Sequence, residues 1–134
     1  MKLSLSDPGL LKNQGYVDGQ WIDADSGETF AVTNPANGEV VAEVARLGTA
    51  ETARAISAAE RAMPAWRNLT AKQRAGILRK WYDLMMANQE DLAIIMTAEQ
   101  GKVLAESRGE IAYGAAFIEW FGEEAKRIDG DVIP

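Results

Sequence analysis

The residues of this chain that are best suited to chemistry lie in its last third, between Thr97 and Pro134. A Gly-Lys pair in this stretch could bind phosphate, but only if it closed a glycine-rich loop after a strand and preceded Ser or Thr. Here Gly101-Lys102 follows a helical pattern, and Val103 takes the position of the hydroxyl. We therefore exclude a phosphate loop. No G-x-G-x-x-G pattern occurs either, so a dinucleotide fingerprint is also absent from these residues.

Carboxylates are the second candidate group. Glu106 and Glu110 stand one helical turn apart and could act as an acid–base pair or hold a cation. The same spacing is typical of a solvated helix face, and we interpret the pair in that way. No Asp-rich loop of the EF-hand kind is present.

The third candidate is a set of aromatic residues at helical spacing. The helix predicted over 103–127 carries two apolar stripes, which we expect on adjacent faces, so that the helix is sandwiched between two layers. One stripe is Ile111, Ala115 and Ile118, and the other is Tyr113, Phe117 and Trp120. Spacing alone favours core packing for the aromatic stripe, with a ligand wall as the alternative.

Two residue types are missing from the chain altogether. It contains no Cys, which excludes disulfides, a thiol nucleophile and a thiolate metal site. It contains no His, the commonest general base. The formal net charge of −6 argues against a nucleic-acid partner, and no apolar run is long enough to span a bilayer. Since the N-terminus does not resemble a signal peptide, we expect a cytoplasmic protein without a membrane partner.

The elements that must position these residues begin with two predicted hairpins. Asp18-Gly19 suits a type I′ turn between two short β-forming runs, and Trp21 beside it is interpreted as a hairpin packing residue rather than a ligand platform. A turn at 25–27 follows. The segments 29–33 and 40–44 then flank a loop rich in Asn, Pro and Gly, which predicts the second hairpin.

Helices follow from Thr49 onward. Thr49 is the predicted N-cap of the first helix, with Glu51 in its first turn and Pro64 ending it. Thr70 and Gln73 form a capping box for the second helix. That helix has a broad apolar stripe expected to face a core: Ile77, Leu78, Trp81, Tyr82, Leu84 and Met85.

The end of the chain predicts two more helices and the beginning of a strand. A third helix starts at Asn88, buries Leu92, Ile95 and Met96 and ends at Gly101, and the helix over 103–127 follows. Residues 131–133 look like the start of a strand. The fold class is therefore α+β for this length, two hairpins and then four helices. Because a small isolated sheet is marginally stable, the chain reads as part of a larger fold.

Several motifs together resemble the aldehyde dehydrogenases, in particular the bacterial succinate-semialdehyde dehydrogenases. They are Y-V-D-G-Q-W (16–21), V-T-N-P-A-N-G-E-V (32–40), P-A-W-R (64–67), R-A-G-I-L-R-K-W (74–81), E-Q-G-K (99–102) and F-I-E-W-F-G-E-E-A-K-R-I-D-G-D-V-I-P (117–134). No single motif is diagnostic, but their order and spacing are specific.

The resemblance implies an α/β enzyme longer than this chain, which oxidises a small aldehyde with NAD or NADP. Residues 1–13 would be a lead-in, 14–127 the N-terminal portion of a Rossmann-like cofactor domain, and 128–134 the start of an oligomerisation hairpin of a homo-oligomer, dimer or tetramer. The family's catalytic Cys, Glu and Asn match no residue here, and the catalytic domain is absent. We expect the chain alone to be inactive.

The resemblance also assigns roles to individual residues. A structural Na⁺ or K⁺ would be held by the backbone carbonyl of Thr33 and the side chain of Glu99. The aldehyde tunnel would be lined by Tyr113 and Phe117, with Trp120 as a further candidate. No residue of this chain matches a catalytic or cofactor-binding position.

Other interpretations stay open. A non-catalytic binding or scaffold module could use the same unit of hairpins and helices. Betaine aldehyde or another semialdehyde could replace succinate semialdehyde as the substrate.

Overall fold

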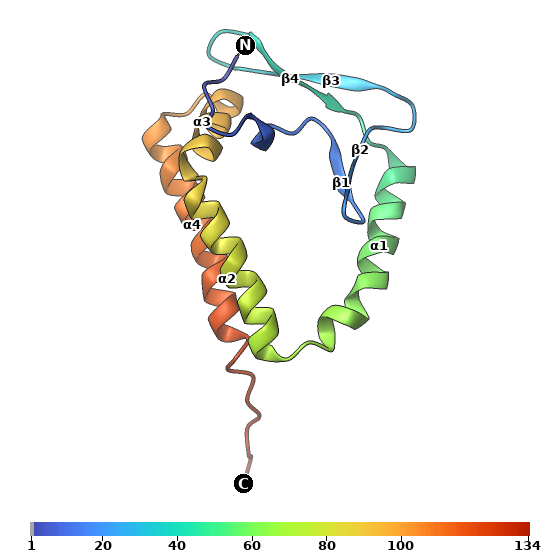
Figure 1. Ribbon diagram of the computed structural model, residues 1–134, viewed down its shortest axis with the longest axis vertical. Helices are drawn as coiled ribbons and strands as arrows, with labels where there is room; N and C mark the ends of the chain where they lie inside the picture. The colour runs from blue at the N-terminus through green and yellow to red at the C-terminus, as the bar shows by residue number, and fades with distance from the viewer. Residues whose placement is uncertain (1) are drawn as a thin grey trace.

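The computed structural model describes residues 2–134 and consists of two small antiparallel hairpins followed by four helices (Figure 1). The order predicted from the sequence is confirmed. The elements are a 3₁₀ turn η1 (Pro8–Leu10), β1 (Gly15–Val17), β2 (Gln20–Ile22), β3 (Thr29–Thr33), β4 (Val40–Ala45), α1 (Thr49–Arg67), α2 (Ala71–Ala87), α3 (Gln89–Gln100) and α4 (Leu104–Glu124).

The first hairpin forms at the predicted turn. Asp18 and Gly19 both have positive φ, 52° and 81°, as a type I′ turn requires. Tyr16 is paired with Trp21 across the strands, and their ring centroids lie 5.1 Å apart. The Lys12 ammonium lies 5.1 Å from the centroid of the Trp21 ring. Trp21 is therefore a packing residue of the hairpin, as the sequence predicts.

The second hairpin pairs β3 with β4 and carries one irregularity in register, between Val32 and Thr33. Its loop closes through the Asn34 N–H, which donates to the Glu39 carbonyl at 2.8 Å. Gly38 in this loop has a φ of 75°, a conformation that glycine adopts without strain. The turn predicted at 25–27 is also present, since the Gly27 N–H donates to the Ala24 carbonyl at 2.8 Å.

Helix α1 differs from the prediction at both ends. Gly48, not Thr49, is the N-cap, because the Glu51 carboxylate accepts the Gly48 N–H at 2.9 Å and sets the first turn one residue earlier. Pro64 lies inside the helix rather than ending it, and Trp66 belongs to its last turn. A proline removes one helical N–H, but its carbonyl still accepts the Asn68 N–H at 3.1 Å, so the helix continues for one more turn.

Helices α2, α3 and α4 pack together as a bundle. The capping box at Thr70 and Gln73 and the left-handed Gly101 at the end of α3, with a φ of 73°, are both as predicted. Ser107 of α4 is fully buried, and its hydroxyl lies 2.8 Å from that of Thr97 in α3. Gly122 of α4 abuts α2, since a Cβ there would lie 3.4 Å from the Leu78 Cβ.

The apolar stripe of α2 is narrower than predicted. Leu78, Tyr82 and Met85 are half-buried, together with the buried Ala75 that faces the bundle. The other three residues of the expected core stripe are about half exposed: Ile77 at 49%, Trp81 at 55% and Leu84 at 53%. Because α4 packs against one side of α2, the other half of the stripe is only partly covered within residues 2–134.

The two apolar stripes of α4 lie on opposite faces, so the prediction of adjacent faces was wrong. Each aromatic residue stands two positions after its aliphatic counterpart, which is roughly 160° around the axis at about 100° per residue. The aliphatic stripe packs inward, with Ile111 8% exposed and Ala115 fully buried. The aromatic stripe points away from the bundle. Only one of the two expected covering layers is present in the described chain.

The elements form an open arrangement (Figure 1). Helix α1 stands apart from the α2–α4 bundle and contacts β1, while the second hairpin contacts α3. Residues 125–134 leave α4 without forming a strand, and Val132 and Ile133 are 94% and 89% exposed. A strand has no partner here for its N–H and C=O groups, so the strand start predicted at 131–133 is not formed. The assignment of 128–134 to an oligomerisation hairpin stays a prediction.

Candidate aromatic site

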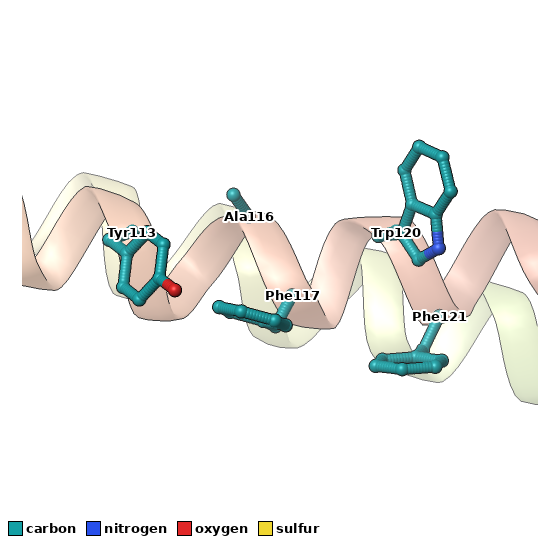
Figure 2. Close-up of a pocket in the computed structure, with 5 residues that line it drawn as sticks. All are labelled: Tyr113, Ala116, Phe117, Trp120 and Phe121. Atoms are coloured by element: carbon teal, nitrogen blue, oxygen red, sulfur yellow. The ribbon is translucent and has the colours of Figure 1, made fainter.

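An exposed aromatic surface on α4 is the main candidate site. The rings of Tyr113 and Phe117, one helical turn apart, meet edge to face with centroids 4.9 Å apart. Together with Ala116, Trp120 and Phe121 they line an open hollow of about 330 Å³ (Figure 2). The structure thus brings together all three residues predicted for a tunnel wall. We call the five residues that line this hollow the aromatic face.

The aromatic face is not part of the core of the described chain. Tyr113 is 68% exposed, Phe117 48% and Trp120 63%. The interpretation of these residues as core packing is therefore not supported within residues 2–134. Since the lining side chains are almost wholly apolar, the face can bind an apolar molecule or an apolar segment, but it holds no acid–base pair or nucleophile.

Phe121 is a member of the face that the sequence reasoning missed. It is 60% exposed and follows Phe117 by one helical turn. The signal was present, because an aromatic residue four positions after another lies on the same side of a helix.

A polar hollow of about 580 Å³ continues the aromatic face towards the end of α4. It is lined by Ala116, Glu119, Trp120, Glu123, Glu124, Lys126 and Arg127. Its charged side chains form ion pairs: the Glu119 carboxylate accepts from Arg79 of α2 at 2.9 Å, and Lys126 lies 2.7 Å from Glu123. Exposed pairs of this kind contribute little to stability.

The carboxylates considered for acid–base work are not poised for it. Glu110 forms an ion pair with Lys102, the lysine after the Gly101 turn. Glu106 is exposed in the first turn of α4. The interpretation of these two residues as a solvated face therefore holds.

Thr33 and Glu99, the residues assigned to a cation, lie at the ends of neighbouring elements. The end of α3 packs against the turn after β3, since a Cβ on Gly101 would lie 2.7 Å from the Pro35 Cγ. Both Thr33 and Glu99 are exposed. In the part of the chain that the structure describes, no group of three or more Asp, Glu, His or Cys side chains could hold a metal ion. The cation site stays a prediction based on the resemblance.

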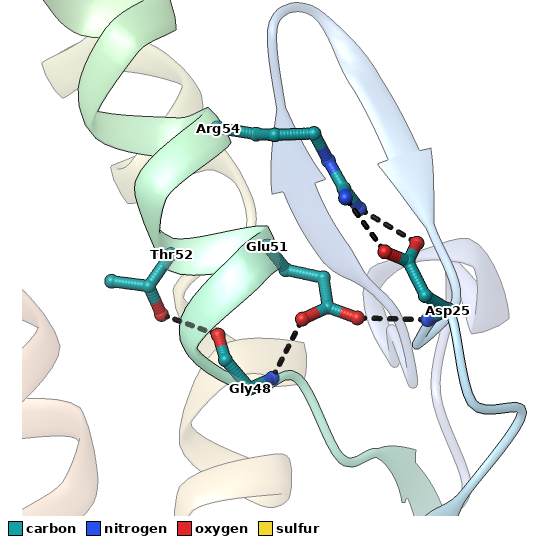
Figure 3. A network of polar contacts seen from close by, with 5 residues as sticks. All are labelled: Asp25, Gly48, Glu51, Thr52 and Arg54. Carbon is teal, nitrogen blue, oxygen red and sulfur yellow. Dashed lines mark hydrogen bonds and ion pairs between the residues drawn. The ribbon is translucent and has the colours of Figure 1, made fainter.

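A polar network that the sequence reasoning did not foresee, buried at Glu51 and exposed at Asp25 and Arg54, joins α1 to the loop before β3 (Figure 3). Glu51 is 5% exposed, and its two oxygens accept the N–H groups of Asp25 and Gly48 at 2.8 and 2.9 Å. These backbone donors, that of Asp25 first, hold the pKa of Glu51 below its ordinary value. The Asp25 carboxylate is bound by both terminal nitrogens of Arg54, at 2.6 and 2.7 Å, which lowers the pKa of Asp25. The network is structural, because all four carboxylate oxygens of Glu51 and Asp25 are bonded to groups of the chain.

None of the helices within residues 2–134 is long and apolar enough to cross a membrane.

Comparisons with known sequences and with solved structures all point to the same family. The sequence profile of the "Aldehyde dehydrogenase family" matches residues 21–134. The chain is 62% identical over 132 residues to a glutarate-semialdehyde dehydrogenase of Pseudomonas aeruginosa, and 58% identical to the NADP⁺ succinate-semialdehyde dehydrogenase of Escherichia coli. Each match covers 98% of this chain and 27% of the relative.

Solved structures agree with the sequence matches. A crystal structure described as an NADP-dependent enzyme of E. coli superposes with a TM-score of 0.95 at 58% identity, over 98% of this chain and 27% of that one. The chain thus spans about 27% of the length of the relatives it matches. Its order of hairpins and helices is the one those enzymes share over the matched region. The chain belongs to the aldehyde dehydrogenase family.

Proposed function

We propose that this chain is the N-terminal portion of an NAD(P)-dependent semialdehyde dehydrogenase, which oxidises a short aldehyde with a terminal carboxylate to the corresponding diacid. The proposal rests on sequence identity: about three residues in five, over nearly the whole chain, are identical to those of enzymes named for glutarate and succinate semialdehyde. Both substrates are linear aldehydes with a distal carboxylate, so their shared chemistry is narrower than that of the family.

The aromatic face fits one part of such a substrate. A wall of Tyr113, Phe117 and Trp120 can contact the methylene chain of a semialdehyde and exclude water from it. It offers no cation for the distal carboxylate, so charge recognition would be supplied from outside this face. We therefore assign these residues to the aldehyde tunnel, where they position the chain of the substrate and take no part in bond breaking.

The choice between succinate and glutarate semialdehyde rests on one methylene group. A hydrophobic site distinguishes one methylene by about 10- to 200-fold at most. We propose succinate semialdehyde as the preferred substrate, with glutarate semialdehyde as the principal competitor.

The test uses the full-length protein encoded by the gene that carries this sequence. Reduction of NAD⁺ and NADP⁺ is followed by the absorbance of the reduced nicotinamide, with succinate semialdehyde, glutarate semialdehyde and betaine aldehyde as substrates. The proposal expects kcat/KM for either semialdehyde to exceed that for betaine aldehyde by at least about 100-fold. A preference for betaine aldehyde, or no reduction with any of the three, would sink it.

The cofactor is proposed as NADP, because the E. coli succinate-semialdehyde dehydrogenase and the E. coli crystal structure carry NADP in their descriptions. No residue of this chain is assigned to cofactor binding, so the same assay with the two nucleotides decides the matter. A kcat/KM that favours NAD⁺ would contradict this choice while leaving the aldehyde proposal intact.

A monovalent cation is proposed to bind between Thr33 and Glu99. Hard oxygen atoms suit Na⁺ or K⁺, and the end of α3 packs against the turn after β3, which brings the two elements together. The expected result is a Tm that is higher in KCl or NaCl than in tetramethylammonium chloride for the wild-type protein and equal in all three salts for Glu99→Gln. An unchanged response in the variant would remove Glu99 from the site.

The full-length enzyme is proposed to be a cytoplasmic homo-oligomer, a dimer or a tetramer, with residues 128–134 beginning the hairpin that joins protomers. The exposure of Val132 and Ile133 supports this, because exposed large apolar residues commonly become buried at interfaces. Light scattering of the full-length protein tests it, and a monomer at micromolar concentration would contradict it.

A further inference from the structure

The N-terminal segment ahead of β1 is attached to the rest of the molecule at both of its ends. We define the strap as residues 5–14, which lead from α3 to β1 (Figure 1). The family profile begins at residue 21, so the strap lies outside the region that defines the family. The sequence suggests only a lead-in here.

At its first end the strap is held by Asp91, in the first turn of α3. One carboxylate oxygen of Asp91 accepts the Ser6 N–H at 2.9 Å, and the other accepts the Asp7 N–H at 2.7 Å. Asp91 is 3% exposed, so this pair of bonds is shielded from water. Bonds from N–H groups to an ionised carboxylate are stronger than those between neutral groups.

The middle of the strap has a defined shape. The Asp7 side chain accepts the Gly9 N–H at 2.9 Å and caps the η1 turn, while the Asp7 carbonyl accepts the Leu10 N–H at 3.1 Å. Leu5, Leu10 and Leu11 are half-buried. Asp7 therefore has two roles: its N–H binds α3, and its carboxylate and carbonyl hold the turn.

At its other end the strap is held by the hairpin layer. The Asn13 carbonyl accepts the Ala45 N–H of β4 at 2.8 Å. Gly15, directly after the strap, abuts Leu47, since a Cβ at Gly15 would lie 2.2 Å from a Leu47 methyl carbon. This close approach leaves no room for a larger residue.

Within residues 2–134 the strap thus connects two groups of elements that otherwise have few contacts with each other. The α2–α4 bundle meets the hairpins through the contact of α3 with β3, near Gly101 and Pro35, and it joins α1 through the connection at 68–70. We propose that the strap is a conformational brace, in which Asp91 anchors one end and the Asn13–Ala45 bond the other, so that the hairpin layer is held in place relative to the bundle.

A brace predicts coupling between its two ends, which a passive lead-in does not. Such coupling is reciprocal, so loosening either end must loosen the other. The measurement is amide hydrogen exchange of the full-length protein, followed at Ser6 and Asp7 for the first end and at Ala45 for the second.

The first variant is Asp91→Asn, which keeps the size of the side chain but replaces one acceptor oxygen by an amide N–H donor. We expect exchange at Ser6 and Asp7 to become at least about tenfold faster, and exchange at Ala45 to become faster too, by about threefold or more. The control is Asp83→Asn, an exposed carboxylate on α2 that pairs with Arg79. The control should change none of these amides.

The second variant works from the other end and covers the case in which Asp91→Asn does not fold. Gly15→Ala forces Leu47 to move and should speed exchange at Ser6 and Asp7, although Asp91 is intact. If Asp91→Asn frees only Ser6 and Asp7 and leaves Ala45 protected, or if Gly15→Ala leaves Ser6 and Asp7 unchanged, the strap is not a brace. Faster exchange at the distant end in every variant that folds supports it.

Discussion

The Glu51 carboxylate accepts the backbone N–H of Asp25 at 2.8 Å, although the two residues are 26 positions apart in the chain. The same carboxylate accepts the Gly48 N–H at 2.9 Å, so one buried side chain ties the start of α1 to the loop before β3 (Figure 3). Asp25 in turn binds Arg54 one turn further along α1. The three residues form a closed link between the hairpins and the first helix.

Replacing Glu51 by Gln should destabilise the chain. The Gln side chain keeps one acceptor oxygen, but its amide nitrogen would face an N–H group that also donates, leaving one buried donor without a partner. We expect Tm to fall by about 3 to 6 °C. Glu60→Gln, at an exposed position of the same helix, is the matched control and should shift Tm by less than about 1 °C. Equal shifts for the two variants would show that the link contributes nothing specific.

Stability should decrease in acid because two buried carboxylates must be charged. Backbone N–H groups hold the pKa of Glu51 and of Asp91 below the ordinary values of 4.5 and 3.8. A carboxyl with a lowered pKa in the folded state contributes stability above its unfolded pKa and loses it as the pH falls through the folded pKa. We expect a constant Tm down to about pH 5 and a steady fall below pH 4.5.

A double variant tests whether Glu51 and Asp91 cause the acid sensitivity. The double variant Glu51→Gln, Asp91→Asn carries no ionisable group at either position, so its Tm should depend less steeply on pH below 4.5 than that of the wild type. Parallel curves for the two proteins would assign the acid sensitivity to other groups.

Gly101 should not tolerate a side chain. Its φ is 73°, and a Cβ would lie 2.7 Å from the Pro35 Cγ. Gly101→Ala is expected to cost about 1 to 2 kcal/mol from the left-handed backbone alone, with the contact to Pro35 adding to this. The control is Gly109→Ala, inside α4, where nothing lies within 4 Å of the new Cβ. That variant should stabilise by about 0.5 to 1 kcal/mol. Urea unfolding measures the change in the free energy of unfolding for both variants. A change of the same sign in the two variants would contradict the prediction.

The two faces of α4 should respond differently to truncation. Ile111→Ala removes buried side-chain volume and should cost about 2 to 5 kcal/mol in the free energy of unfolding of the chain. Phe117→Ala removes a half-exposed ring whose main contact is Tyr113, and should cost less than about 1.5 kcal/mol. In the full-length enzyme we expect the opposite order of effects on KM: Phe117→Ala should raise KM for the semialdehyde more than Ile111→Ala does. An unchanged KM in Phe117→Ala would remove it from the tunnel.

The 134-residue chain by itself should reduce neither NAD⁺ nor NADP⁺. It has no Cys to form a covalent intermediate and no His to act as a base, and the charged groups Glu119, Glu123 and Lys126 near the aromatic face are held in ion pairs. Incubation of the purified chain with succinate semialdehyde and each nucleotide tests this directly. Turnover above a buffer blank would overturn the prediction.

What the sequence determined by itself was the local structure. The type I′ turn at Asp18-Gly19, the capping box at Thr70 and the end of α3 at Gly101 were all predictable, because each depends on the φ preference or hydrogen bonding of a few adjacent residues. The order of two hairpins and four helices followed from these signals together with apolar periodicity. The set of aromatic residues on α4 was also predictable from spacing, although Phe121, one turn after Phe117, was missed.

Only the tertiary structure decided which surfaces are buried and which polar groups meet. Periodicity shows that α2 and α4 each carry a wide apolar surface. Which face of each helix becomes buried depends on the neighbouring element that packs there. The packing within residues 2–134 leaves Trp81 and Trp120 exposed. Asp25, one of the two partners of Glu51, lies 26 residues away from it, and the partners of Asp91 lie about 85 residues away, beyond the reach of any local pattern. Their pairing required the chain to fold back on itself, and a carboxylate buried in this way is stable only because backbone donors far along the chain arrive at it.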